Sequence, residues 1–277
     1  MSLKALPELK GFDALRTLAF EPDPQAVEQW NPALRAAEAD DPATVSIYDT
    51  IGEDEWGGFS DKRMAAALRA IGPKDVTVNI NSPGGDFFQG LAIYSLLRDH
   101  PARVTVQVMG LAASAASVIA MAADDLRISD VGFLMIHNAW GVVIGNRHDL
   151  RQAAETLEPF DDAMASLYAR RANVDKETAA AWMDQETWLN AEQAVEAGLA
   201  DSVINGERPV EAPDATTNSL AAIRRVEAAL ASQGLSRRER RSLLGEITNT
   251  PRPAVADETP ELVGALRSLL SSLENKA

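Results

Sequence analysis

Short runs of β-branched and other apolar residues recur along the central part of the chain, separated by segments with a longer apolar period. The runs are typical of strands and occupy residues 45–48, 76–80, 104–108, 126–128 and 133–136. Apolar residues spaced three and four positions apart predict helices over residues 61–71, 89–100 and 147–171. This alternation of strands and helices predicts an α/β domain with mostly parallel strand pairing.

Capping residues and prolines mark where several of these helices begin or end. Ser60 is a suitable N-cap for the first helix, and Pro101 stops the second. Asp175 and Asn190 are suitable N-caps for two further short helices, the second of which ends at Gly198. Most of the predicted helices therefore have a defined start.

A run of small residues, 110–123, follows the strand predicted over residues 104–108. It is too apolar for a surface helix and is therefore predicted to lie in the interior. Ser114 lies within this run, where the strand gives way to the start of a helix.

The two ends of the chain differ in character from the middle. Prolines before residue 43 break any long helix there, and a proline-containing linker follows residue 206. Beyond the linker, leucines on one helical face predict an amphipathic helix over residues 262–273. We therefore predict three parts, the outer two less ordered: an N-terminal extension (1–43), an α/β domain (44–206), and a linker with a helical C-terminal extension (207–277).

Composition and charge narrow the classes of function. Apolar residues make up 46% of the chain and charged residues 24%, as in ordinary globular proteins. The net charge of −15 argues against a surface that binds nucleic-acid phosphates or an anionic membrane. No apolar run reaches the roughly 18 residues of a membrane-spanning helix, and the first twenty residues lack the apolar core of a signal peptide. We therefore expect a cytoplasmic protein with no nucleic-acid or membrane partner.

The residue types present leave one kind of nucleophilic chemistry open. The chain has no Cys, which excludes disulfides and thiolate nucleophiles, and it has no cluster with metal-ligand spacing, so no metal site is expected. A serine nucleophile needs a nearby base, a group that orients the base, and backbone N–H groups facing the oxyanion. Ser114 among alanines, His137 directly after a strand, and the glycines at 84 and 85 could supply these parts.

Each of these features also has a structural interpretation. A serine flanked by alanines is common in helix packing, a histidine after a strand is often structural, and Pro-Gly-Gly is often only a turn. The chain also lacks the Gly-x-Ser-x-Gly elbow of the α/β-hydrolases. The residues alone therefore leave both interpretations open.

Four segments, in order and spread over roughly residues 45–204, resemble the proteolytic subunit of the Clp protease. They are Asn79-Ile80-Asn81-Ser82-Pro83-Gly84-Gly85, Gly110-Leu111-Ala112-Ala113-Ser114-Ala115, Met135-Ile136-His137, and Trp188-Leu189-Asn190-Ala191 continuing to Asp201. Together they are far more specific than any one of them. The resemblance implies a crotonase-like spiral of β-β-α units and peptide-bond hydrolysis inside a closed homo-oligomeric ring or stacked rings, with no cofactor.

The resemblance also implies roles for individual residues. Ser114 is expected to be the nucleophile and His137 the general base, while the backbone N–H groups of Gly85 and Ala115 form the oxyanion hole. The turn at Gly84 and Gly85 is expected to pair with an extended substrate backbone.

One position departs from the family pattern. The family has an acidic triad residue, an aspartate, just before its aromatic-Leu-Ser-Ala element, and here that position holds Glu186. A glutamate can orient an imidazole in principle, but its extra methylene changes its reach. We assign Glu186 as the third triad member, with Asp184, two residues earlier, as its rival.

The flanking sequence separates branches of the family. Residues 207–277 extend beyond the core, and together with Glu186-Thr187-Trp188 they resemble the Clp-related head maturation proteases of phages and prophages. Those enzymes cleave scaffold and capsid precursors without an unfoldase, so capsid or scaffold proteins are the expected partners. The alternatives are an ATP-dependent Clp peptidase that works with a ring ATPase, a non-catalytic ring or scaffold component, and an acyl-CoA enzyme of the wider crotonase fold. The helix over residues 147–171 is expected to form the handle through which two rings stack.

Overall fold

The computed structural model describes residues 19–20, 22–31, 43–53 and 57–204, with a few single positions between 223 and 244. The chain divides into two compact units, residues 1–240 and 241–277, and the elements described below all belong to the first unit. The linker predicted after residue 206 and the helix predicted over residues 262–273 lie outside the continuously described part.

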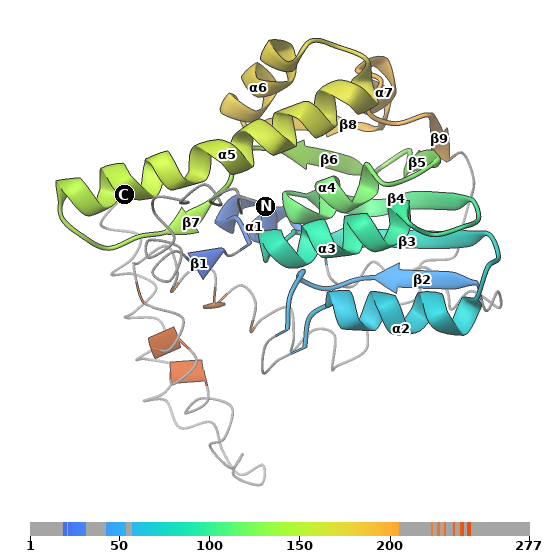
Figure 1. Cartoon of the computed structure of the whole chain (residues 1–277), viewed down its shortest axis with the longest axis horizontal. Coiled ribbons are helices and arrows are strands. Elements are labelled where there is room, and N and C mark those ends of the chain that lie inside the picture. The colour runs from blue at the N-terminus through green and yellow to red at the C-terminus, as the bar shows by residue number, and fades with distance from the viewer. Residues whose placement is uncertain are drawn as a thin grey trace, which may run out of the picture. The chain divides into compact units, whose positions relative to one another are not determined.

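The centre of the fold is a sheet of mostly parallel strands (Figure 1). Five strands pair in parallel in the order β2 (Thr44–Ile47), β3 (Val76–Ser82), β4 (Val104–Ala113), β5 (Asp125–Ser129) and β9 (Ser202–Ile204). β6 (Phe133–Ile136) pairs in parallel with the far end of β4, and β8 (Thr187–Asn190) pairs antiparallel with β6. The predicted α/β class and the mostly parallel pairing are confirmed.

Helices follow the strands, and their starts agree with the sequence signals. They are α2 (Asp61–Ile71), α3 (Phe87–Arg98), α4 (Ala115–Ala120), α5 (Arg147–Ala172), α6 (Lys176–Asp184) and α7 (Ala191–Glu196). The side chains of Ser60, Asp175 and Asn190 accept backbone N–H bonds at the starts of α2, α6 and α7, as predicted. α2 lies beside α3, α3 beside α4, and α5 beside α6.

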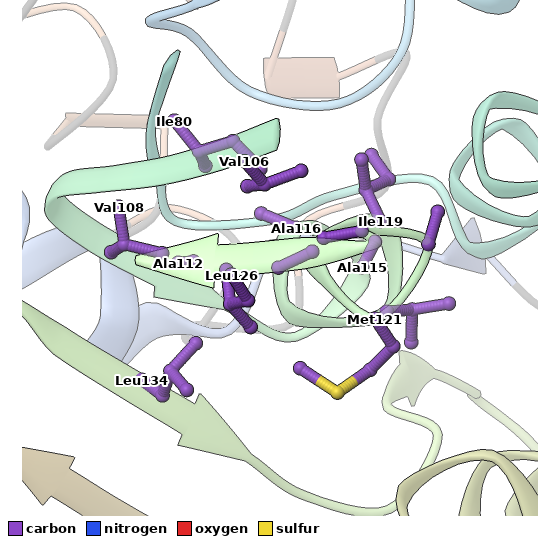
Figure 2. Close-up of a cluster of buried hydrophobic side chains, with 14 of the residues drawn as sticks. Ile80, Val106, Val108, Ala112, Ala115, Ala116, Ile119, Met121, Leu126 and Leu134 are labelled. Carbon is purple, nitrogen blue, oxygen red and sulfur yellow. The ribbon is translucent and has the colours of Figure 1, made fainter. Parts of the chain in front are cut away.

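β4 pairs with β3 on one side, and with β5 and then β6 on the other. Its first half pairs with β3 and β5, and after a register shift near Ile80 its end pairs with β6. The small-residue run predicted to be interior is divided between the end of β4 and α4. Its members Ala112, Ala115 and Ala116 are buried among larger apolar side chains (Figure 2). Small residues let α4 pack closely on the sheet, so the junction between β4 and α4 is tightly held.

The N-terminal extension contributes a short strand and a helix that pack on this junction. β1 (Ala19–Phe20) pairs antiparallel with β7 (Gly141–Val142), and α1 (Pro24–Gln29) follows. Trp30, after α1, is buried and donates from Nε1 to the carbonyl of Asn81 at 3.0 Å. Residues 19–31 are therefore folded onto the α/β domain.

α5 is 26 residues long and has two different halves. Near its end, Met164, Leu167 and Tyr168 are buried in the core, whereas Leu150 in its first half is 49% exposed. Figure 1 shows the first half extending beyond the sheet. In the described part of the chain, no helix, α5 included, is both long and apolar enough to cross a membrane.

Candidate active site

Ser114 stands at the junction of β4 and α4 in an uncommon backbone conformation. Its φ is 54° and its ψ is −125°, a region that costs a non-glycine residue free energy. The surrounding backbone holds it there: its N–H donates to the carbonyl of Met135 at 3.0 Å, and its own carbonyl accepts from the N–H of Ser117 at 2.9 Å. Strain maintained by the fold at a single serine is typical of functional positions.

Ser117 is part of the support for this conformation. Its Oγ lies 2.7 Å from the carbonyl oxygen of Ser114, to which it donates, and 2.8 Å from the hydroxyl of Tyr168 on α5. Both side chains are buried, and burial raises the pKa of the Tyr168 hydroxyl above its ordinary value. No sequence pattern indicates this network, because Tyr168 is 51 residues away from Ser117.

His137 is the first residue after β6 and faces Ser114. Ala113 and Met135 are register partners in the parallel pair of β4 and β6, so the residues that follow these strands emerge side by side. Nε2 of His137 lies 2.7 Å from Oγ of Ser114. Burial lowers the pKa of the His137 imidazole, and the negative charge of Asp23 opposes this shift. The imidazole is therefore favoured in its neutral form, the form that can accept a proton.

Glu186 lies opposite His137, in line with the ladder between β6 and β8. Ile136 pairs with Thr187, so the next residues outward on the two strands are His137 and Glu186. Oε1 of Glu186 is buried and has no hydrogen-bond partner, and no hydrogen bond joins this side chain to His137 in the described structure. Burial raises the pKa of the Glu186 carboxyl, and the charge of Asp23 raises it further. Glu186 is thus the register neighbour of His137, and its Oε1 has no hydrogen-bond partner.

Asp184, the rival acid, is placed differently. It is the last residue of α6 and is exposed, and its Oδ1 accepts from Nδ2 of Asn138 at 2.8 Å. Its carboxylate is therefore hydrogen-bonded to Asn138, the residue after His137.

The glycine turn after β3 packs directly against Ser114. Gly84 has a φ of 88°, and a Cβ there would lie 2.6 Å from the carbonyl oxygen of Ala113 and 2.7 Å from Cβ of Ser114. A Cβ on Gly85 would lie 2.2 Å from the carbonyl oxygen of Ile51. Only glycine fits at either position. Within the described residues, the N–H groups of Gly85 and Ala115 donate to no protein acceptor.

Two further observations limit which groups can belong to the site. His100 lies elsewhere, with Nε2 2.7 Å from the carbonyl oxygen of Lys74, and His148 is exposed at the start of α5. His137 is therefore the histidine that the fold brings to Ser114. Across the described ranges, no group of three His, Asp or Glu side chains is arranged to hold a metal ion.

Comparison with known proteins identifies the fold. Among solved structures, a ClpP1 mutant from Listeria monocytogenes matches with a TM-score of 0.52 over 60% of this chain and 93% of its own, at 21% sequence identity. At that identity the match concerns the fold alone, and the predicted Clp-peptidase-like fold is confirmed.

Comparison at the sequence level identifies the family. The ATP-dependent Clp protease proteolytic subunit 1 of Streptomyces avermitilis is 30% identical over 193 residues, covering 63% of this chain and 89% of its own. The ATP-dependent Clp protease proteolytic subunit of Ligilactobacillus salivarius is 33% identical over 143 residues, covering 50% of this chain and 71% of its own. The family model for Clp protease matches residues 62–207. This chain therefore belongs to the Clp protease family, a family of peptidases.

Proposed function

We propose that this protein is a serine endopeptidase in which Ser114 is the nucleophile and His137 the general base. The observation that carries the proposal is the 2.7 Å approach of Oγ to Nε2 at the ends of two adjacent parallel strands. The strained backbone of Ser114 supports it, and so does burial that lowers the pKa of His137.

The reaction follows from this geometry as an acyl transfer in two steps. Oγ of Ser114 attacks the scissile carbonyl carbon while its proton passes to Nε2 of His137. The imidazolium then donates that proton to the departing amine, which leaves an ester on Ser114. A water attacks the ester and gives its proton to His137, and return of the proton to Oγ releases the carboxylic acid product.

The N–H groups of Gly85 and Ala115 are proposed as the oxyanion hole. Neither donates to a protein group in the described structure, and Ala115 N lies 3.0 Å from the place where a Gly84 Cβ would stand. Preorganised N–H donors of this kind stabilise the developing charge, and each is worth about 2.7–4 kcal/mol in comparable enzymes. The turn at Gly84 and Gly85 is also the proposed site at which an extended substrate pairs.

Glu186 is proposed as the carboxylate that stabilises the His137 imidazolium. It lies opposite His137 in the β6–β8 register, and its Oε1 is free to accept from Nδ1–H. Asp184 is a weaker candidate because its Oδ1 is bound to Asn138.

For the biological role we propose maturation of a phage or prophage head, by cleavage of scaffold or capsid precursors within a homo-oligomeric ring. The basis is the resemblance of residues 186–188 and 207–277 to head maturation proteases, whereas the family match ends at residue 207. The relatives named above are ATP-dependent Clp subunits, and this favours peptidase action with a ring ATPase as the second candidate. Cleavage of a folded capsid precursor without any ATPase would support the first role, and a requirement for the ATPase the second.

The catalytic proposal is tested with Ser114→Ala, assayed on an unstructured protein such as casein. Loss of the attacking oxygen should lower the cleavage rate by about a thousandfold or more. Ser117→Ala is the matched control, because it removes a supporting hydrogen bond and leaves the nucleophile, so cleavage should remain measurable. If Ser114→Ala cleaves casein at a near-normal rate, Ser114 is not the nucleophile, and Ser117 becomes the next candidate.

A further inference from the structure

The described residues of the N-terminal segment, 19–20 and 22–31, lie beside the strands that lead to Ser114 and His137. On one side of Asp23, Phe20 pairs with Gly141, four residues after His137. On its other side, Ala26 is buried in a cluster that includes Ala113 and Met135, the residues just before the catalytic pair. Asp23 lies between these two anchors in the sequence, so it is held close to the strand ends at which Ser114 and His137 stand.

The same cluster reaches the third member of the site. Trp30 belongs to it, and Trp188, two residues after Glu186, packs against it. Trp30 is fixed further by its Nε1 bond to the carbonyl of Asn81, and Nδ2 of Asn81 in turn donates to the carbonyl of Asn31 at 2.8 Å. The segment is therefore anchored to strands that position all three proposed triad residues.

Asp23 itself is a buried carboxylate in a defined place. It is 5% exposed and forms the N-cap of α1, where Oδ1 accepts from the N–H groups of Gln25 at 2.9 Å and Ala26 at 3.1 Å. Oδ2 accepts no hydrogen bond from the described residues. A buried carboxylate with a fixed orientation therefore lies at the edge of the candidate active site.

Several acidic side chains of the described structure lie around His137. Glu186 lies opposite it, Asp184 is bound to Asn138, and Asp161 of α5 accepts from the N–H of Ala139 at 2.6 Å. None of these carboxylates, nor Asp23, forms an ion pair within the described ranges. The charge of Asp23 raises the pKa of both His137 and Glu186, which agrees with its placement between the two anchors.

We propose that Asp23 is a positioning residue of the active site, whose buried carboxylate stabilises protonated His137 and so supports the general-base step. The residue lies outside the part of the chain that matches the family, residues 62–207. It thus adds to this site a second carboxylate, carried on the N-terminal segment, beside Glu186. The inference rests on the proposed serine-peptidase function.

The test measures how fast a fluorophosphonate modifies Ser114 from about pH 5 to about pH 9, the range in which histidine titrates. Asp23→Asn and Asp23→Ser both keep an N-cap and remove the charge, so either serves if the other folds poorly. Without the charge the pKa of His137 falls. The acid limb of the rate profile should then move to lower pH by about half a unit or more, and the plateau rate should fall about twofold to threefold. Asp23→Glu keeps a carboxylate at this position, so it should restore part of the acid-limb position and part of the plateau rate.

The matched control is Asp175→Asn, which alters the N-cap of α6 in the same way. Its acid limb and plateau should equal those of the wild type. An unchanged acid limb in folded Asp23→Asn and Asp23→Ser would overturn the proposal and leave Asp23 as a helix cap. An equal shift of the acid limb in Asp175→Asn would also overturn the proposal, because the shift would then be a general effect of changing a helix cap. A wild-type enzyme whose Ser114 is never modified would instead refute the proposed function, and this inference with it.

Discussion

Backbone strain in the described part of the chain is concentrated at two residues of the candidate site. Three non-glycine residues have positive φ there: Ser114, Asn173 and Glu186. Asn173 is the left-handed C-cap of α5, a position that asparagine tolerates well. Ser114 has no such explanation, and Glu186, which directly follows the C-cap of α6, is an uncommon residue type at a left-handed helix end. Both adjoin His137. A fold that maintains strain at these two positions fixes the proposed attacking oxygen and the proposed orienting carboxylate relative to the imidazole.

The choice between the two acids gives the first prediction at this scale. Glu186→Gln should lower peptidase activity by about a hundredfold or more, because an amide cannot stabilise an imidazolium and can favour the wrong tautomer. Asp184→Asn should have a much smaller effect, since its carboxylate is exposed and contacts Asn138. Steady-state hydrolysis of one peptide by both variants provides the comparison. The opposite ranking would assign the third triad position to Asp184.

The glycine turn gives a second residue-scale prediction. In Gly84→Ala the new Cβ would collide with the carbonyl oxygen of Ala113 at 2.6 Å and with Cβ of Ser114 at 2.7 Å. This should displace the nucleophile and abolish fluorophosphonate labelling. Gly72→Ala is the matched control, because Gly72 also has a positive φ, 72°, but nothing lies within 4 Å of its Cβ position. It should lower stability by about 1–2 kcal/mol and leave labelling intact. Normal labelling of Gly84→Ala would show that the turn does not constrain Ser114.

At the scale of elements, the sequence predicted a helix or strand correctly where the element's own residues carry the pattern, such as an apolar period or an N-cap. The predicted strand 133–136 is β6, residue for residue, and the predicted helix 61–71 is α2 with its Ser60 cap. β4 runs to Ala113, five residues beyond its predicted end at 108, because the small residues 110–113 pair with β6 as well as with β3. β1, β7 and β8 are short and owe their pairing to partners distant in sequence, and such pairing leaves no local pattern.

The exposed half of α5 provides the element-scale prediction. Leu157 and Phe160 pack against the core, and the rings of Phe160 and Phe87 meet edge to face with their centroids 5.3 Å apart. Asp at position 157 or 160 would therefore damage the fold itself. Leu150 is 49% exposed and tests the predicted handle more cleanly. Leu150→Asp should split the assembly into smaller species, since a new charge would be buried between subunits.

The matched control for the handle is Gln152→Asp, which places the same charge at another exposed position of the same helix. It should leave the assembly as it is. Sedimentation velocity measures both variants. If Leu150→Asp sediments like the wild type, α5 is not the handle.

At the scale of the whole molecule, the sequence predicted the catalytic domain better than its surroundings. Ser114 and His137 are both embedded in family motifs, and the structure places their side chains 2.7 Å apart. Asp23 and Tyr168 could not be predicted in the same way, because their relation to the site depends on how α1 and α5 pack. The least specific prediction, head maturation, depends on residues that flank the family match.

Truncation before Pro209 tests that prediction. The proposed triad and oxyanion hole lie upstream, so hydrolysis of a short unstructured peptide should be nearly unchanged. Cleavage of a native capsid or scaffold precursor should fall, because loss of a tether lowers the effective concentration of the substrate. Arg240 is buried and donates from Nη1 to the carbonyl of Leu235, so part of the tail forms contacts of its own. Equal loss on both substrates would make the tail part of the folded enzyme, and no loss on either would favour a general peptidase.

The central claim is that the fold activates one serine, Ser114, through His137. The most direct measurement is to label the wild-type protein with a fluorophosphonate and to locate the modified residue by mass spectrometry of its peptides. We expect modification at Ser114 alone, and none in His137→Ala, because the hydroxyl is a weak nucleophile without its base. Modification at Ser117, or modification of Ser114 at the same rate in His137→Ala, would contradict the claim.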